Sequence, residues 1–143
     1  MDLVMVATSA RGDTRLLHTT ARRRAEDEGS GLLVVHVVGG VEYERQAPQM
    51  RRAIRDEIKW LLHAMLVPAA GVPGSSIGRM TVDVREGDVV EQLIDAVRSS
   101  RPDLVMLGVP QPHAADALSE GAYSRLISYL EDNSIPVERV PTA

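Results

Sequence analysis

Short apolar runs alternate along the chain with longer stretches in which apolar residues recur at helical spacing. A continuous apolar run of about four to eight residues is typical of a strand that is covered on both faces of a parallel sheet. Strict alternation of apolar and polar residues, as in residues 80–85, is typical of a strand with one exposed face. The predicted strands are residues 3–7, 32–38, 80–85, 104–107 and 136–140.

Four helices are predicted between these strands, because each intervening stretch carries apolar residues three or four positions apart. Asp13 stands where the cap of the first helix is expected. The second helix is predicted from about Pro48 to Val67, the third follows Gly87-Asp88, and the fourth runs from about Ala122 to Asp132. The positions expected to be buried in the four helices are, in chain order, Leu17, Ala21 and Ala25; Met50, Ile54, Ile58, Leu61, Leu62 and Met65; Val89, Val90, Leu93, Ile94 and Val97; and Leu126, Ile127 and Leu130.

The alternation of strand and helix predicts one α/β domain over residues 1–143. A helix between every two strands requires crossover connections, which join parallel strands and place helices on both faces of the sheet. The length of 143 residues suits a single domain of ordinary size. We therefore expect a three-layer sandwich built on a five-stranded parallel sheet with four helices.

Composition narrows the range of functions. The chain has no Cys, which excludes disulfides, thiolate catalysis and Cys-ligated zinc. A net charge of −4 and an aromatic content of 3% do not suit a nucleic-acid-binding surface. No basic segment precedes the first apolar run, and no run approaches the about 20 residues of a transmembrane helix. We expect a cytoplasmic protein without nucleic-acid or membrane partners.

Three stretches carry a resemblance to a known family. They are the opening run Leu3-Val4-Met5-Val6-Ala7, the run Leu33-Val34-Val35-His36-Val37-Val38, and the segment from Glu86-Gly87-Asp88 to Asp103-Leu104-Val105-Met106-Leu107-Gly108. In these stretches the chain resembles the universal stress protein family, and the resemblance covers nearly the whole sequence. It implies an adenine-nucleotide alpha-hydrolase-like sheet with strand order 3-2-1-4-5, and pairing of two chains through the last strand.

The family pattern also implies where a nucleotide would bind. Its nucleotide-binding members carry a loop with Gly, two residues, Gly, nine residues, Gly, and then Ser or Thr. Gly108 and Gly121 occupy the first and third glycine positions, but Gln111 replaces the second glycine and Ala122 replaces the hydroxyl residue. A family Asp at the end of the first strand, which helps to hold the nucleotide, aligns with Thr8.

These replacements disfavour ATP on physical grounds. A phosphate loop binds through backbone N–H groups, which Pro110 and Pro112 lack. Gln111 carries a Cβ atom at a position where the loop is expected to need a positive φ, which glycine adopts more easily than other residues. Asp116 and Glu120 add negative charge, and no Lys or Arg lies between the two retained glycines. We therefore expect weak or no ATP binding and no bound cofactor.

Other candidate sites have less support. His36 lies in an apolar run and is expected to be a packed residue with one satisfied nitrogen, whereas His18, His63 and His113 are expected to face solvent. Segment 9–14 has a slight resemblance to a flavodoxin phosphate loop, but an ordinary capped turn is favoured. The paired acids and the Lys of a response-regulator receiver are missing. No metal site is expected, and neither is an enzyme, because no nucleophile has an evident base beside it.

The sequence thus predicts a non-catalytic stress-response module that acts through homodimerisation and contacts with an unidentified protein. The dimer is expected to form through residues 136–140, because an edge strand leaves backbone groups unpaired, with Glu138 of one chain near Arg139 of the other. The alternative is a domain that binds a nucleotide or another small molecule in a remodelled pocket, at the carboxyl ends of the first and fourth strands. The residues expected to line that pocket are Ala7, Thr8, Val37, Gly108, Gln111, Gly121 and Ala122.

Overall fold

A computed structural model describes residues 1–8, 15–70, 79–108 and 120–141 of the chain. The predicted cap at Asp13, the segment 9–14 and the loop residues 109–119, Gln111 and both prolines among them, lie outside these ranges. The elements, in chain order, are β1 (Leu3–Ala7), α1 (Arg15–Glu28), β2 (Gly31–Val38), α2 (Val41–Glu44), α3 (Pro48–Ala70), β3 (Met80–Glu86), α4 (Val89–Ser100), β4 (Leu104–Gly108), α5 (Glu120–Asp132) and β5 (Val137–Val140).

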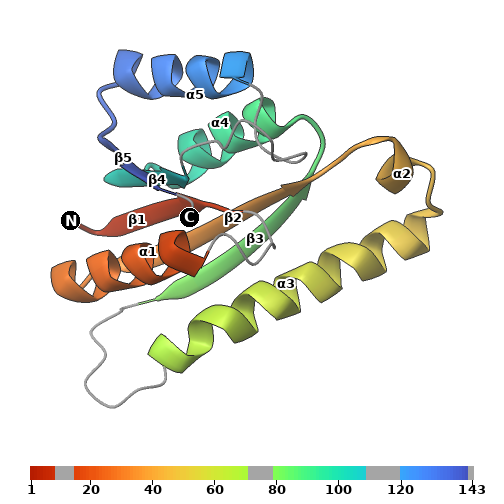
Figure 1. Cartoon of the computed structure of the whole chain (residues 1–143), viewed down its shortest axis with the longest axis horizontal. Helices are drawn as coiled ribbons and strands as arrows, with labels where there is room; N and C mark the ends of the chain where they lie inside the picture. Colours follow the sequence, from red (N-terminus) through yellow and green to blue (C-terminus); the bar gives the residue numbers. More distant parts are fainter. Residues whose placement is uncertain (9–14, 71–78, 109–119, 142–143) are drawn as a thin grey trace.

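The five strands form one parallel sheet in the order β3-β2-β1-β4-β5, which confirms the predicted fold class. Helices α1 and α3 cover one face of this sheet and α4 and α5 cover the other, so the molecule has three layers (Figure 1). The described ranges hold five helices rather than the four expected, because the short α2 follows β2. In these ranges no helix combines the length and the apolar character that crossing a membrane would require.

The core is built around β1, the middle strand of the sheet. Val4, Met5 and Val6 are at most 1% exposed, because helices cover both faces of this strand. Val4 and Val6 belong to the apolar cluster under α1 and α3, and Met5 belongs to the cluster under α4 and α5. A continuous apolar strand is therefore required here, as the sequence pattern predicted.

The predicted buried face of α3 is partly wrong. Met50, Leu61 and Met65 are 51%, 41% and 39% exposed, whereas Leu62 and Leu66 are almost fully buried against the sheet. Helix α3 carries two apolar stripes side by side, and its periodicity does not say which stripe faces the core. Val89 of α4 was also expected to be buried and is 37% exposed.

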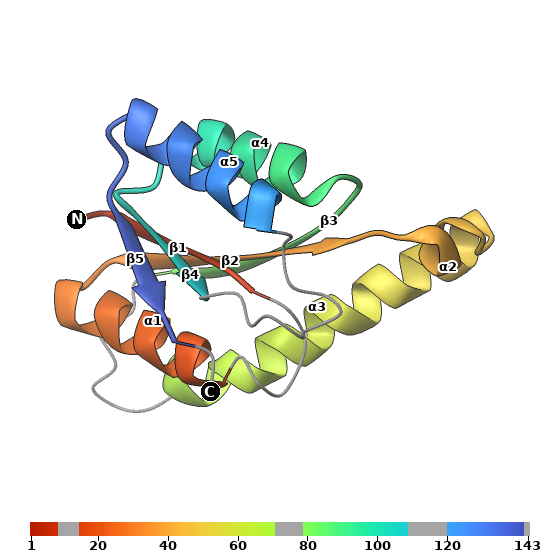
Figure 2. The ribbon, with the colours of Figure 1, turned by 45° about the horizontal axis from the view of Figure 1, so that its top comes forward.

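A polar cluster joins α2 and α3 to the end of β3. The Tyr43 hydroxyl donates to Glu86 Oε2 over 2.6 Å, and Arg55 Nη1 donates to the same oxygen over 2.7 Å. The Tyr43 hydroxyl and the Arg55 guanidinium hold the pKa of the Glu86 carboxyl below its usual value. This cluster fixes α2 beyond the carboxyl ends of β2 and β3, where α3 extends past the strands (Figure 2).

A second polar contact fixes the start of β1. The Asp103 carboxylate accepts hydrogen bonds from the backbone N–H groups of Asp2 and Leu3, at 2.7 and 2.9 Å. These bonds favour the charged form and hold the pKa of Asp103 below its usual value. Asp103 therefore aligns the amino ends of β1 and β4, whose carboxyl ends form the candidate site.

The two stripes of α3 allow a matched stability test. Leu62→Ala is expected to lower the free energy of unfolding by about 2–5 kcal/mol, because it leaves a cavity in the core. Leu61→Ala changes an exposed position and is expected to change that free energy by less than about 0.5 kcal/mol. Urea unfolding of dilute samples measures both. Equal destabilisation by the two variants would contradict this orientation of α3.

Candidate functional site

The candidate site lies at the carboxyl edge of the sheet, where β1 and β4 lie side by side. From β1 the chain crosses over to β2 on one side, and from β4 it crosses over to β5 on the other. This reversal makes the β1–β4 edge the switch point, and ligands of open α/β sheets bind in the crevice outside such a point.

The structure brings part of the predicted pocket to this edge. Ala7 pairs in register with Leu107, so Thr8 and Gly108 both come directly after this pair. Val37 lies on β2, two residues beyond Val35, the register partner of Ala7. Gly121 and Ala122 lie in the first turn of α5, and Gln111 is outside the described residues.

Gly121 leaves room at the start of α5. A Cβ atom built on this residue would meet no other described atom within 4 Å. Packing within the described chain therefore does not require glycine here. The open space is compatible with a ligand lying against the first turn of α5, where backbone N–H groups and the helix dipole favour an anion.

Two histidines converge on Thr8 at the centre of the edge. The Thr8 hydroxyl shares a short hydrogen bond with Nε2 of His18, which lies on α1. The Thr8 carbonyl accepts a hydrogen bond of 2.7 Å from Nδ1 of His36, on β2. The Thr8 backbone N–H donates to the Val35 carbonyl over 2.9 Å. Thr8 is thus held through its side chain and through both of its backbone polar groups.

The prediction for His36 is confirmed and that for His18 is wrong. His36 is half-buried with one nitrogen bonded, as expected of a packed histidine. His18 was expected to face solvent but is only 5% exposed. It follows Leu17 directly and lies at the margin of the buried stripe of α1, where it reaches the end of β1. The sequence does not show that Thr8 is the hydrogen-bond partner of His18.

His18 offers little positive charge to a ligand. Burial lowers the pKa of His18 from its ordinary value of 6.5, so this side chain is neutral at pH 7. Its Nδ1 atom is buried and has no hydrogen-bond partner within ranges 1–8, 15–70, 79–108 and 120–141. Because a carbonyl oxygen can only accept, the proton of His36 lies on Nδ1. In the described part of the chain, no three His, Asp or Glu side chains are grouped closely enough to hold a metal ion.

Tyr123 and Arg139 form a second feature near this edge that sequence reasoning missed. The Arg139 guanidinium lies 5.9 Å from the centre of the Tyr123 ring, within the range of a cation–π contact. The Tyr123 hydroxyl is buried without a hydrogen-bond partner in the part of the chain that the structure describes, and burial raises its pKa. Arg139 on β5 pairs in register with Leu107 on β4, which in turn pairs with Ala7, so β4 lies between Arg139 and the end of β1. No sequence motif marks the pair.

No family model and no curated protein matches the sequence. Solved structures do match over nearly the whole chain. A universal stress protein from Burkholderia pseudomallei has a TM-score of 0.70 at 20% identity, with 98% of this chain and 96% of that chain covered. A universal stress protein in complex with cAMP has a TM-score of 0.61 at 13% identity, with 99% and 98% covered.

A third match is a universal stress protein family protein from Arabidopsis thaliana with AMP bound. Its TM-score is 0.57 at 17% identity, with 100% of this chain and 93% of that chain covered. At identities of 20% and below, these likenesses establish the fold. They agree with the resemblance that the sequence carries and with the observed strand order.

Burial of neutral His18 makes stability depend on pH in a defined direction. Because the pKa of His18 is lowered in the folded chain, the unfolded chain takes up the proton first as the pH falls. The contribution of His18 to the free energy of unfolding is therefore fully present above pH 6.5 and falls as the pH drops below that value. One such group costs at most about 1.4 kcal/mol per pH unit. In urea titrations between pH 7.5 and 5, His18→Gln is expected to flatten this fall, while exposed His63→Gln retains it. An unchanged fall in His18→Gln would contradict the assignment.

Proposed function

We propose that this chain, whose fold is that of the universal stress proteins, is a non-catalytic regulatory domain that binds ATP weakly if at all and acts as a homodimer. The observation that carries the proposal is the state of Thr8. Where the nucleotide-binding members have a carboxylate, this chain has a hydroxyl that is already bonded to a neutral, buried His18.

The loop after β4 supports the same proposal from the sequence. Of its four pattern positions, Gln111 and Ala122 are changed, and Pro110 and Pro112 have no N–H to donate. No Lys or Arg lies between Gly108 and Gly121 to compensate the charge of a triphosphate. A triphosphate would therefore meet few donors and little positive charge.

The contact between Thr8 and His18 also bears on catalysis. A hydroxyl beside an imidazole is the first half of a nucleophile–base–acid arrangement, in which a third group orients the imidazole. Among the described residues, the Nδ1 atom of His18, which would need that third group, has no partner. The pair therefore supports a structural role for His18 at the end of β1 and a regulatory rather than an enzymatic domain.

A second candidate function is the binding of a smaller nucleotide in a remodelled pocket. The solved structures that favour it hold cAMP and AMP, each with a single phosphate. One phosphate needs fewer donors than three, and a Cβ atom built on Gly121 would meet no other described atom within 4 Å, which leaves space for it beside α5. Arg139 would supply the positive charge that the loop lacks.

The proposed homodimer uses the free edge of β5. The Val105 N–H donates to the Pro136 carbonyl, so the backbone groups of Pro136 face β4. Because successive residues of a strand point their backbone groups to opposite sides, those of Val137 and Arg139 face away from β4 and are available to a second chain. Within the chain, Glu138 pairs with Arg24 at 3.1 Å, so the proposed pairing does not depend on Glu138.

Calorimetric titration with Mg-ATP, AMP and cAMP tests the ligand proposal. We expect no measurable heat from ATP at micromolar concentrations. The variant Gln111→Gly, Pro110→Gly, Ala122→Ser is expected to bind ATP more tightly by roughly 1–3 kcal/mol, because recovered donors would bond a charged group. Low-micromolar binding of ATP by the unmodified chain would refute weak ATP binding. Saturable binding of AMP or cAMP alone would favour the second candidate.

Light scattering tests the proposed dimer. Arg139→Pro removes an outward N–H of β5 while keeping the core side chains, and proline is tolerated where an edge N–H faces solvent. We expect a dimer for the unmodified chain and a monomer for Arg139→Pro. The matched control, Arg139→Ala, keeps the N–H and is expected to stay dimeric. A mass near one 15.6 kDa chain at all micromolar concentrations would rule out the dimer.

A further inference from the structure

The outward backbone groups of β5 form a ladder of two residues. Pro141, directly after the strand, has no N–H to donate. The N–H of Ile135, just before the strand, is already used, since it donates to a carbonyl of α5 over 2.9 Å. Within the described residues, a second chain that adds to this edge therefore finds both a free N–H and a C=O only at Val137 and Arg139.

These limits fix the register of a two-fold pair. Two edge strands related by a two-fold axis run antiparallel, and residues that lie opposite each other then exchange either two hydrogen bonds or none. With the axis at Glu138, Val137 of each chain lies opposite Arg139 of the other, and every outward N–H and C=O of these residues is paired. Moving the axis by one residue brings Ile135 or Pro141 into the ladder and leaves a carbonyl unpaired.

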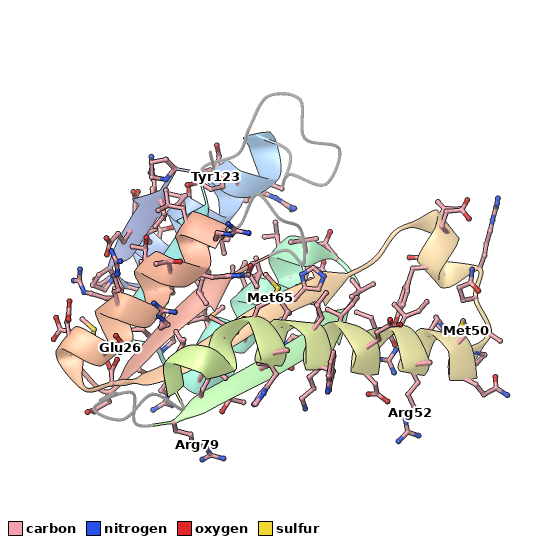
Figure 3. All side chains as sticks on the ribbon, turned by 60° about the horizontal axis from the view of Figure 1, so that its bottom comes forward. Glu26, Met50, Arg52, Met65, Arg79 and Tyr123 are labelled. Carbon is pink, nitrogen blue, oxygen red and sulfur yellow. The ribbon has the colours of Figure 1, made fainter. Side chains whose placement is uncertain are left out.

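Successive side chains of β5 lie on opposite faces of the sheet. Glu138 lies on the face that α1 covers, where its carboxylate accepts a hydrogen bond of 3.1 Å from Arg24. Arg139 lies on the other face, over Tyr123 of α5. Figure 3 shows α1 on the near side of the sheet and Tyr123 beyond it. The expected contact between Glu138 of one chain and Arg139 of the other does not fit this register, because these side chains lie on opposite faces.

Two Glu138 carboxylates meet at such an axis. Opposite residues that exchange no hydrogen bonds have Cα atoms about 4.5 Å apart, and like charges in that position are destabilising. Each carboxylate already has its own cation, because Arg24 Nη1 lies 3.1 Å from Glu138 Oε2. The side chains of Arg24 and Glu138 are 40% and 38% exposed, so a second chain can reach this ion pair.

We infer that the axis of the β5 dimer passes through Glu138 and that Arg24, on α1, permits this pairing by neutralising the carboxylate at the axis. The inference rests on the proposed homodimer and names the residue that controls it. Arg24 Nε also lies 3.7 Å from Glu28, so loss of Arg24 would leave two carboxylates of each chain without this cation. Association then depends on a residue of α1 that contributes nothing to the backbone ladder.

Cysteine cross-linking tests the register, because the chain has no Cys of its own. Glu138→Cys places two Cys residues at the axis, within the Cα separation of about 4.4–6.8 Å that a disulfide spans. Arg139→Cys is the matched control, because two residues 139 lie about 8 Å apart in this register. We expect a linked dimer for Glu138→Cys under mild oxidation and none for Arg139→Cys. Linkage of Arg139→Cys instead, or of neither variant, would overturn the register.

Sedimentation velocity of charge variants tests the role of Arg24. Arg24→Ala is expected to raise the dissociation constant of the dimer at least about tenfold, because unpaired like charges meet at the axis. High salt screens that repulsion and is expected to restore the dimer. Adding Glu138→Gln to Arg24→Ala removes the repulsion and is expected to do the same. Arg23→Ala, which loses the same charge from the neighbouring exposed position, is the matched control and is expected to stay dimeric.

The outcomes separate this inference from the dimer itself. A dimer of Arg24→Ala that is as stable as that of the unmodified chain would overturn the role of Arg24 and leave the β5 dimer intact. A weakened Arg24→Ala dimer that neither salt nor Glu138→Gln restores would also overturn it, because the loss would then be structural. An unmodified chain that is monomeric throughout would overturn the β5 dimer, and this inference with it.

Discussion

Burial of the three central residues of β1 is the constraint on which the rest of the structure depends. Val4, Met5 and Val6 have neighbouring strands on both sides and helices on both faces, which leaves no room for a polar side chain. From β1 the chain crosses over to β2 on one side. After β3 it returns past β1 and forms β4 on the other side. That reversal creates the switch point, and Asp103 holds the amino ends of β1 and β4 in register below it.

Elements whose residues are buried on every side could be predicted from the sequence alone. The centres of β1, β2 and β4 have this property, and continuous apolar runs predicted these strands. The edge strand β3 was predicted from its alternation of apolar and polar residues, and the strand order from the resemblance to the universal stress protein family. Helix α3 does not have this property, because Leu61 and Leu62 are equally apolar and only the tertiary structure decides that one is exposed and the other buried. The short helix α2 was missed for a related reason: it is held by Tyr43, Arg55 and Glu86, which come from three separate segments.

The candidate site shows the same limit. The pattern of glycines located the edge, and Thr8 was recognised as a departure from the family. The role of Thr8 was not predictable, because it depends on His18 and His36, which lie 10 and 28 residues away in sequence. A histidine near the start of a helix carries no sign of whether it faces solvent. The buried, neutral state of His18 follows only once α1 is placed against β1.

These features describe the fold of the universal stress proteins with Thr8, at the carboxyl edge of the sheet, engaged in contacts within the chain. Thr8 is bonded by His18 and His36, and the outward backbone groups of Val137 and Arg139 on β5 are the ones that we propose pair with a second chain. Native mass spectrometry of the protein as purified tests this account most directly, because one spectrum reports both bound ligand and assembly. The account predicts a species of two 15.6 kDa chains without a nucleoside triphosphate. One ATP retained on each chain would contradict it.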